Sequence, residues 1–132
     1  QTTKRVQTIS YCTDDGVCYE GITLPDFIRK EKAKAEEEER NAASYLKQAN
    51  KYQQCYSHKS KRASKIEVRA NKAKREKKKE RKKKKAEKWS TEAQSCKQQA
   101  DYFSGLARQA KEKATQHRNT VSGAQKTLLI NQ

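Results

Sequence analysis

Residues 93–128 have the sequence AQSCKQQADYFSGLARQAKEKATQHRNTVSGAQKTL, and a heptad pattern in this stretch decides the predicted fold. Small or apolar residues recur every seven positions, and a second such line begins three residues after the first. The first line consists of Ala93, Ala100, Ala107, Ala114, Val121 and Leu128, and the second of Cys96, Phe103, Ala110, His117 and Ala124. A sustained alternation of three and four residues is typical of a coiled-coil seam, so the stretch is predicted to be helical.

An earlier stretch carries a second seam. From Asp26 to Ser104 the chain contains no glycine and no proline, and it is rich in Ala, Lys, Glu, Gln and Arg, which is helix composition. The seam is formed by Ile28, Ala35, Ala42, Ala49, Tyr56, Ala63 and Ala70, with Tyr45, Tyr52, Ile66 and Ala73 three residues further on and an interruption at Lys59.

The two seams are out of phase. Ile28 and Ala93 are 65 residues apart, or nine heptads plus two residues, so one straight helix could not keep both seams on one face. Two helices folded against each other are therefore predicted, with the chain reversal between Ala73 and Trp89. Alanine at many seam positions fits this arrangement, because it lets two helix backbones approach closely.

The cysteines indicate the same reversal independently. Residues equidistant from the turn of an antiparallel hairpin lie opposite each other, and Cys55 and Cys96 are equidistant from the junction of Arg75 and Glu76. A Cys55–Cys96 disulfide and a turn near residue 75 are therefore predicted together. The predicted fold class is all-α, a long antiparallel helical hairpin formed by an alanine-rich coiled coil over residues 26–132.

A three-helix bundle is the alternative fold. Its first break would lie at Ser57–Ser60, and the spacing of Ser64 and Glu67 would form a capping box that starts a second helix. Thr91 could start a third helix. This arrangement would place Cys55 and Cys96 at opposite ends of parallel helices, so the hairpin is preferred.

Residues 1–25 differ from the rest of the chain and are predicted to form a short irregular segment. Thr13-Asp14-Asp15-Gly16 is a turn signal between Cys12 and Cys18, which predicts a local Cys12–Cys18 disulfide. Four cysteines permit three pairings, and this is the one that the turn favours. Asp26 is predicted to cap the first helix at its N-terminus.

Composition limits the core of this protein, and the cysteines together with Gln1 predict that it is extracellular and secreted. Leu, Ile, Val and Phe total only 16 of 132 residues, so a conventional globular core is not expected. An even count of four cysteines favours an oxidising compartment. Gln1 suggests pyroglutamate formation after removal of a signal peptide, as in a mature secreted chain. No apolar run approaches the roughly 20 residues of a transmembrane helix.

Charge is concentrated in residues 59–88, called here the basic segment. It holds 17 Lys or Arg and four Glu, whereas the whole chain has a net charge of +16. Glu76 and Glu80 are expected to relieve part of the repulsion through ion pairs with basic neighbours four residues away. The predicted polyanion-binding residues are Lys72, Lys74, Arg75, Lys77, Lys78, Lys79, Arg81, Lys82, Lys83, Lys84, Lys85 and Lys88.

This excess of bases predicts binding to polyanions through counterion release. The expected partners are heparin-like glycosaminoglycans, polyphosphate, anionic surfaces and, without sequence preference, nucleic acid. A solvated helix that only confers solubility would have interspersed charges, as residues 29–40 have. The alternative function is a structural or inhibitory helical protein that docks a specific protein partner, with the basic segment only steering association.

The sequence indicates no enzyme. His58 and His117 are the only histidines, and His117 lies on a seam, where a packed or rim histidine is expected. No cysteine or histidine spacing indicates a zinc site, and the paired aspartates lack the spacing of a calcium loop. No catalytic residue, metal site or cofactor is therefore predicted.

Overall fold

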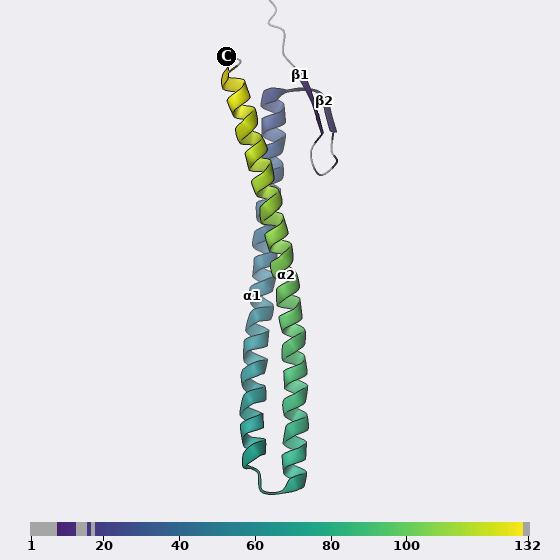
Figure 1. The fold of residues 1–132 in the computed structure, drawn as a ribbon, viewed down its shortest axis with the longest axis vertical. Coiled ribbons are helices and arrows are strands. Elements are labelled where there is room, and N and C mark those ends of the chain that lie inside the picture. Colours follow the sequence, from purple (N-terminus) through teal and green to yellow (C-terminus); the bar gives the residue numbers. More distant parts are fainter. Residues whose placement is uncertain (1–7, 13–15, 17, 131–132) are drawn as a thin grey trace, which may run out of the picture. The chain divides into compact units, whose positions relative to one another are not determined.

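The computed structural model describes residues 8–12, 16 and 18–130, and the side chains of all of these except residues 128–130. The elements are β1 (Thr8–Cys12), β2 (Cys18–Thr23), α1 (Leu24–Lys72) and α2 (Glu76–Ile130). Figure 1 shows them with the connection between the two helices. Residues 1 and 13–15, and the side chain predicted at the end of the C-terminal seam, lie outside the described part.

The predicted antiparallel helical hairpin is confirmed, with the chain reversal at residues 73–75. The three-helix bundle is wrong, because α1 continues without a break through 57–67 and α2 continues through Thr91. A capping box does not interrupt a helix when the residues before it are themselves good helix formers and lie on a packed seam. The described chain divides into two compact units: residues up to Arg40 together with those from Ala110 onward, and residues 41–109.

The first unit begins with an antiparallel strand pair in the segment predicted to be irregular. Cys12 faces Cys18 across the pair and is bonded to it, as predicted. The register shifts between Ile9 and Tyr11, where β2 carries one extra residue. Gly21 lies in that bulge with a φ of 64°, a left-handed conformation that favours glycine.

Helix α1 follows β2 directly, and its first turn is capped by Thr23. The hydroxyl oxygen of Thr23 accepts a hydrogen bond from the backbone N–H of Asp26 at 3.4 Å. The prediction that Asp26 is the N-cap is therefore wrong. Its carboxylate instead pairs with Arg29 one turn later, at 2.5 Å, and adds a negative charge at the positive end of the helix dipole.

A buried phenylalanine joins the strand pair to the start of α1. Phe27 is 3% exposed, and the rings of Tyr11 and Tyr19 pack edge-on against it with centroids at 4.9 and 6.1 Å. Edge-to-face contact of this kind suits aromatic quadrupoles. The small N-terminal sheet is thus held by aromatic packing as well as by its own disulfide.

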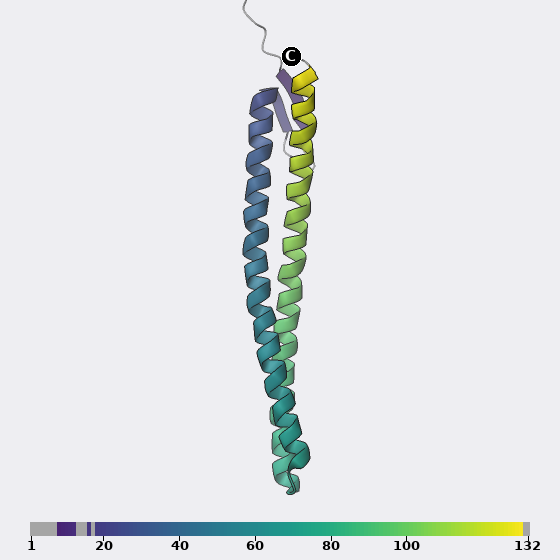
Figure 2. The same ribbon diagram turned by 90° about the vertical axis from the view of Figure 1, so that its left-hand side faces the viewer.

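In the second unit, α1 and α2 run antiparallel with alanine at the contact, and Figure 2 gives the same ribbon from a second direction. The predicted seam residues Ala42, Ala49, Ala70, Ala93 and Ala107 are all at most 5% exposed. Larger rings fill the seam between them: Phe103 stacks with Tyr45 and with Tyr52, at 6.4 and 5.7 Å between centroids. The heptad pattern therefore identified the packed face of each helix.

The predicted Cys55–Cys96 disulfide is also formed, with 5.9 Å between the Cα atoms. It closes a loop of 41 residues that contains the whole basic segment and the chain reversal. The helices are thereby linked covalently between the aromatic part of the seam and the basic segment.

Candidate functional site

The connection between the helices is short. The charges at the end of α1 suit its helix dipole, whereas most of those at the start of α2 do not. The N–H of Ala73 donates to the carbonyl of Ala70 at 3.1 Å, and the N–H of Lys79 donates to the carbonyl of Arg75 at 3.0 Å. Arg69 and Lys72 in the last turn of α1 suit the negative end of its dipole. The first turn of α2 instead combines Glu76 with lysines at the positive end of the dipole.

The structure places the twelve predicted polyanion-binding residues in three consecutive parts of the hairpin. Lys72 ends α1, Lys74 and Arg75 lie in the connection, and the other nine lie in the first four turns of α2. All are exposed except Lys79 and Lys82, which are half-buried because they occupy seam positions.

The positive charge of these residues is not neutralised within the described chain. None of the twelve forms an ion pair among the residues that the structure describes, which makes the expected pairing with Glu76 and Glu80 wrong. Long exposed side chains lose more conformational entropy in a surface ion pair than a weak attraction in water returns. These twelve residues therefore present cations without an ion-pair partner among the described residues.

Antiparallel packing adds a second set of cations that the predicted site did not include. Lys61, Arg62, Lys65 and Arg69 on α1 are all exposed and lie in the part of α1 that pairs with the beginning of α2. All four residues belong to the basic segment, so the sequence already pointed to them. The predicted set of twelve included only residues near the turn, and the antiparallel pairing of the helices adds these four cations to it.

Trp89 organises the inner border of the basic segment. The ammonium of Lys59 and the guanidinium of Arg62 each lie 5.9 Å from the centre of its ring, in cation–π range. The ring of His58 approaches the indole edge-on at 6.5 Å. One aromatic side chain of α2 thus fixes the direction of two cations of α1.

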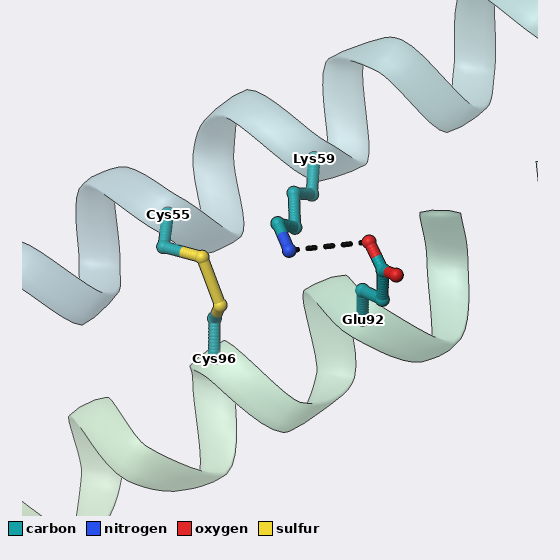
Figure 3. The surroundings of a disulfide bond; sticks show 4 residues. All are labelled: Cys55, Lys59, Glu92 and Cys96. Carbon is teal, nitrogen blue, oxygen red and sulfur yellow. Dashed lines mark hydrogen bonds and ion pairs between the residues drawn. A yellow bond between two sulfur atoms is a disulfide. The ribbon is translucent and has the colours of Figure 1, made fainter. Parts of the chain in front are cut away.

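Lys59 is the one residue of the basic segment with an ion pair in the described chain. Its Nζ lies 3.1 Å from Oε2 of Glu92, one helical turn from the Cys55–Cys96 disulfide (Figure 3). The ion pair occupies the seam position where the apolar line of α1 is interrupted. Its partner lies on α2, so the interruption is a polar contact between the helices.

The described residues contain no group of three or more His, Cys, Asp or Glu side chains placed to hold a metal ion. Neither described helix has a stretch apolar enough to cross a membrane. Comparison with protein-family models, curated proteins and solved structures finds no match to this chain. The functional argument therefore rests on the charge and geometry of the basic segment.

Proposed function

We propose that this protein is a secreted, non-enzymatic polyanion-binding protein that acts through its basic segment. The observation that carries the proposal is the set of twelve cations at one end of the helix pair, none of them paired with a described carboxylate. Heparin-like glycosaminoglycans, polyphosphate and anionic surfaces share the ligand chemistry that such a set attracts.

The absence of neutralising partners among the described residues supports binding over a purely solubilising role. Uncompensated charge at this density is repulsive and costs folding free energy, whereas interspersed charges provide solubility without that cost. Two disulfides, Cys12–Cys18 and Cys55–Cys96, are compatible with an oxidising extracellular location, where sulfated polysaccharides are available as ligands.

The test is heparin or polyphosphate binding by the disulfide-bonded protein and by a variant in which seven lysines are replaced with Gln. The replaced residues are Lys77, Lys78, Lys79, Lys82, Lys83, Lys84 and Lys85. If six to ten cations contact the ligand, affinity should fall by roughly 10³–10⁵ between 50 and 200 mM salt. The variant should lose most of the binding and keep its helical circular dichroism.

The contrary result would favour docking of a protein partner through a helical surface. The specific observation for that second function is Tyr102, a large aromatic residue that is 61% exposed while its neighbour Phe103 is packed in the seam. Binding that ignores salt, together with a Gln variant that binds heparin as well as the parent does, would overturn the polyanion proposal.

A further inference from the structure

The helix pair gives the basic segment two flanks, and side-chain contacts define each of them. On one flank, Lys59 and Arg62 of α1 reach Trp89 and Glu92 of α2. On the other flank the two helices form a groove of about 490 Å³ with Ala63 and Ala86 among the residues that line it. The rest of its lining is Ser60, Ser64, Glu67, Lys83, Glu87 and Ser90.

The acidic residues of the basic segment all belong to the groove flank. Glu67 and Glu87 line the groove. Glu76 and Glu80 stand seven residues before Lys83 and Glu87, and residues seven apart in a paired helix share a face. The groove flank therefore carries four carboxylates, and Lys83 is the one cation among the described residues that line the groove, so a polyanion would be repelled there.

Within the described basic segment, the opposite flank carries cations and no carboxylate. Residues seven apart in a paired helix share a face, so residues seven positions from those already placed on this flank lie on it as well. Arg69 lies seven residues after Arg62. Lys82 and Lys85 lie seven residues before Trp89 and Glu92. Lys78 lies seven residues before Lys85. The remaining members each lie three residues after a residue of this flank, and residues three apart are neighbours on a helix surface. The whole set is called here the cationic face: Lys59, Arg62, Lys65, Arg69 and Lys72 on α1, and Lys78, Arg81, Lys82, Lys85 and Lys88 on α2.

The dimensions of the cationic face select a class of ligand. Its α1 residues span 59–72, or about 20 Å of helix at roughly 1.5 Å per residue, with cations from both helices side by side. Two packed helices are about twice as wide as the single helix that a DNA major groove admits. A rigid duplex would therefore touch only part of the face, whereas a flexible chain can follow all of it.

We infer that the cationic face binds a flexible linear polyanion lengthwise, one that carries closely spaced sulfate or phosphate groups. The inference rests on the proposed polyanion binding and adds the face, the direction and the ligand class. Lys59 and Arg62 are held against Trp89, so the inner end of the face is ordered before the ligand arrives.

Two matched variants test the face in the full, disulfide-bonded chain. The inference narrows the site from the whole basic segment to the cationic face. The face variant replaces Lys65, Lys72, Lys78 and Lys85 with Gln. The control variant replaces Lys61, Lys77, Lys83 and Lys84 with Gln, which belong to the basic segment but lie off the cationic face. All eight lysines are exposed, so both variants remove four surface charges and leave the seam intact. The probes are heparin fragments of increasing length, polyphosphate of increasing length and a DNA duplex.

The face variant should bind heparin or polyphosphate about 100-fold more weakly than the parent near physiological salt, with the salt slope reduced by about three. The control variant should bind less than about tenfold more weakly than the parent, because its lysines attract the ligand only over a distance. Affinity for the chain that binds better should rise with length until a fragment spans about 20 Å and then level off.

Equal losses in the two variants would overturn the cationic face and leave polyanion binding standing. No loss in either variant would overturn both. Preference for the DNA duplex over both flexible chains, with a clear difference between the variants, would overturn the ligand class. Circular dichroism of each variant must match that of the parent, which shows that any loss belongs to binding.

Discussion

Oε2 of Glu31 lies 2.6 Å from Nδ1 of His117 and joins α1 to α2 across 86 residues of chain. The Glu31 residue is fully buried, and the imidazole side chain is 14% exposed. Lys34 approaches the other carboxylate oxygen, Oε1, at 3.9 Å, which is too far for a hydrogen bond. The carboxylate therefore has a hydrogen bond with His117 through Oε2 and a longer ion pair with Lys34 through Oε1.

Replacing His117 with Ala should destabilise the protein by about 1–3 kcal/mol, because a buried carboxylate loses its hydrogen bond. Replacing both Glu31 and His117 with Leu should cost less than the single change, since no polar group is then left buried without a partner. Urea unfolding of the two variants and the parent measures the difference. A double variant less stable than His117→Ala would contradict this account.

The exposed pair of Glu39 and Arg118 predicts a pH effect. A hydrogen bond from the guanidinium at 2.9 Å lowers the pKa of Glu39 below its ordinary value. A lowered pKa in the folded state means that the ionised carboxylate contributes stability above the ordinary pKa. That contribution is lost as the pH falls through the lowered value. Arg118→Ala should raise the pKa of Glu39 towards the ordinary value, as followed by NMR titration of its carboxyl carbon.

The two disulfides should differ in their contribution to stability. Cys55–Cys96 closes a loop of 41 residues and Cys12–Cys18 a loop of six. Replacing the first pair with Ala should lower the unfolding free energy by roughly 2–4 kcal/mol, and replacing the second should lower it by about half as much. Thermal unfolding followed by circular dichroism provides the comparison, and the reverse order would contradict the loop-length argument.

The alanine seam should reject larger side chains. Ala107 is 1% exposed, so Ala107→Leu would force the helices apart and should cost about 1–3 kcal/mol. Ala43 lies on the exposed surface of α1, and Ala43→Leu should change stability by no more than about 0.5 kcal/mol. Chemical denaturation distinguishes these outcomes, and equal effects would mean that the seam is not closely packed.

Much of the fold follows from the sequence because two independent signals agree on it. The heptad lines place Ala35, Ala70 and Ala100 at the contact, and all three are buried. The mirror positions of Cys55 and Cys96 place the reversal near residue 75, where the chain turns. The strand pair was missed because the extra residue at Gly21 interrupts the polar–apolar alternation that marks a strand.

The arrangement of the site was harder to predict. At the start of α2 the seam positions are Lys79 and Lys82, so the apolar signal that would set the phase of the helix is absent there. The concentration of charge was therefore enough to predict the basic segment, but not to predict which of its residues lie on which flank of the helix pair. The burial of Glu31 was not predicted either. In the sequence it resembles the exposed acidic residues that follow it, and its partner His117 is 86 residues away.

The lysines at the first turn of α2 make this helix end locally frustrated. Their charges oppose the helix dipole and one another, so we expect the backbone hydrogen bonds nearest the connection to open more readily than those further along the helices. A bound polyanion would stabilise this helix end, because it neutralises the lysine charges and binds the folded hairpin in preference to the open chain. Recognition and local order are therefore linked, and amide hydrogen exchange around residues 73–79 would slow as the ligand concentration rises.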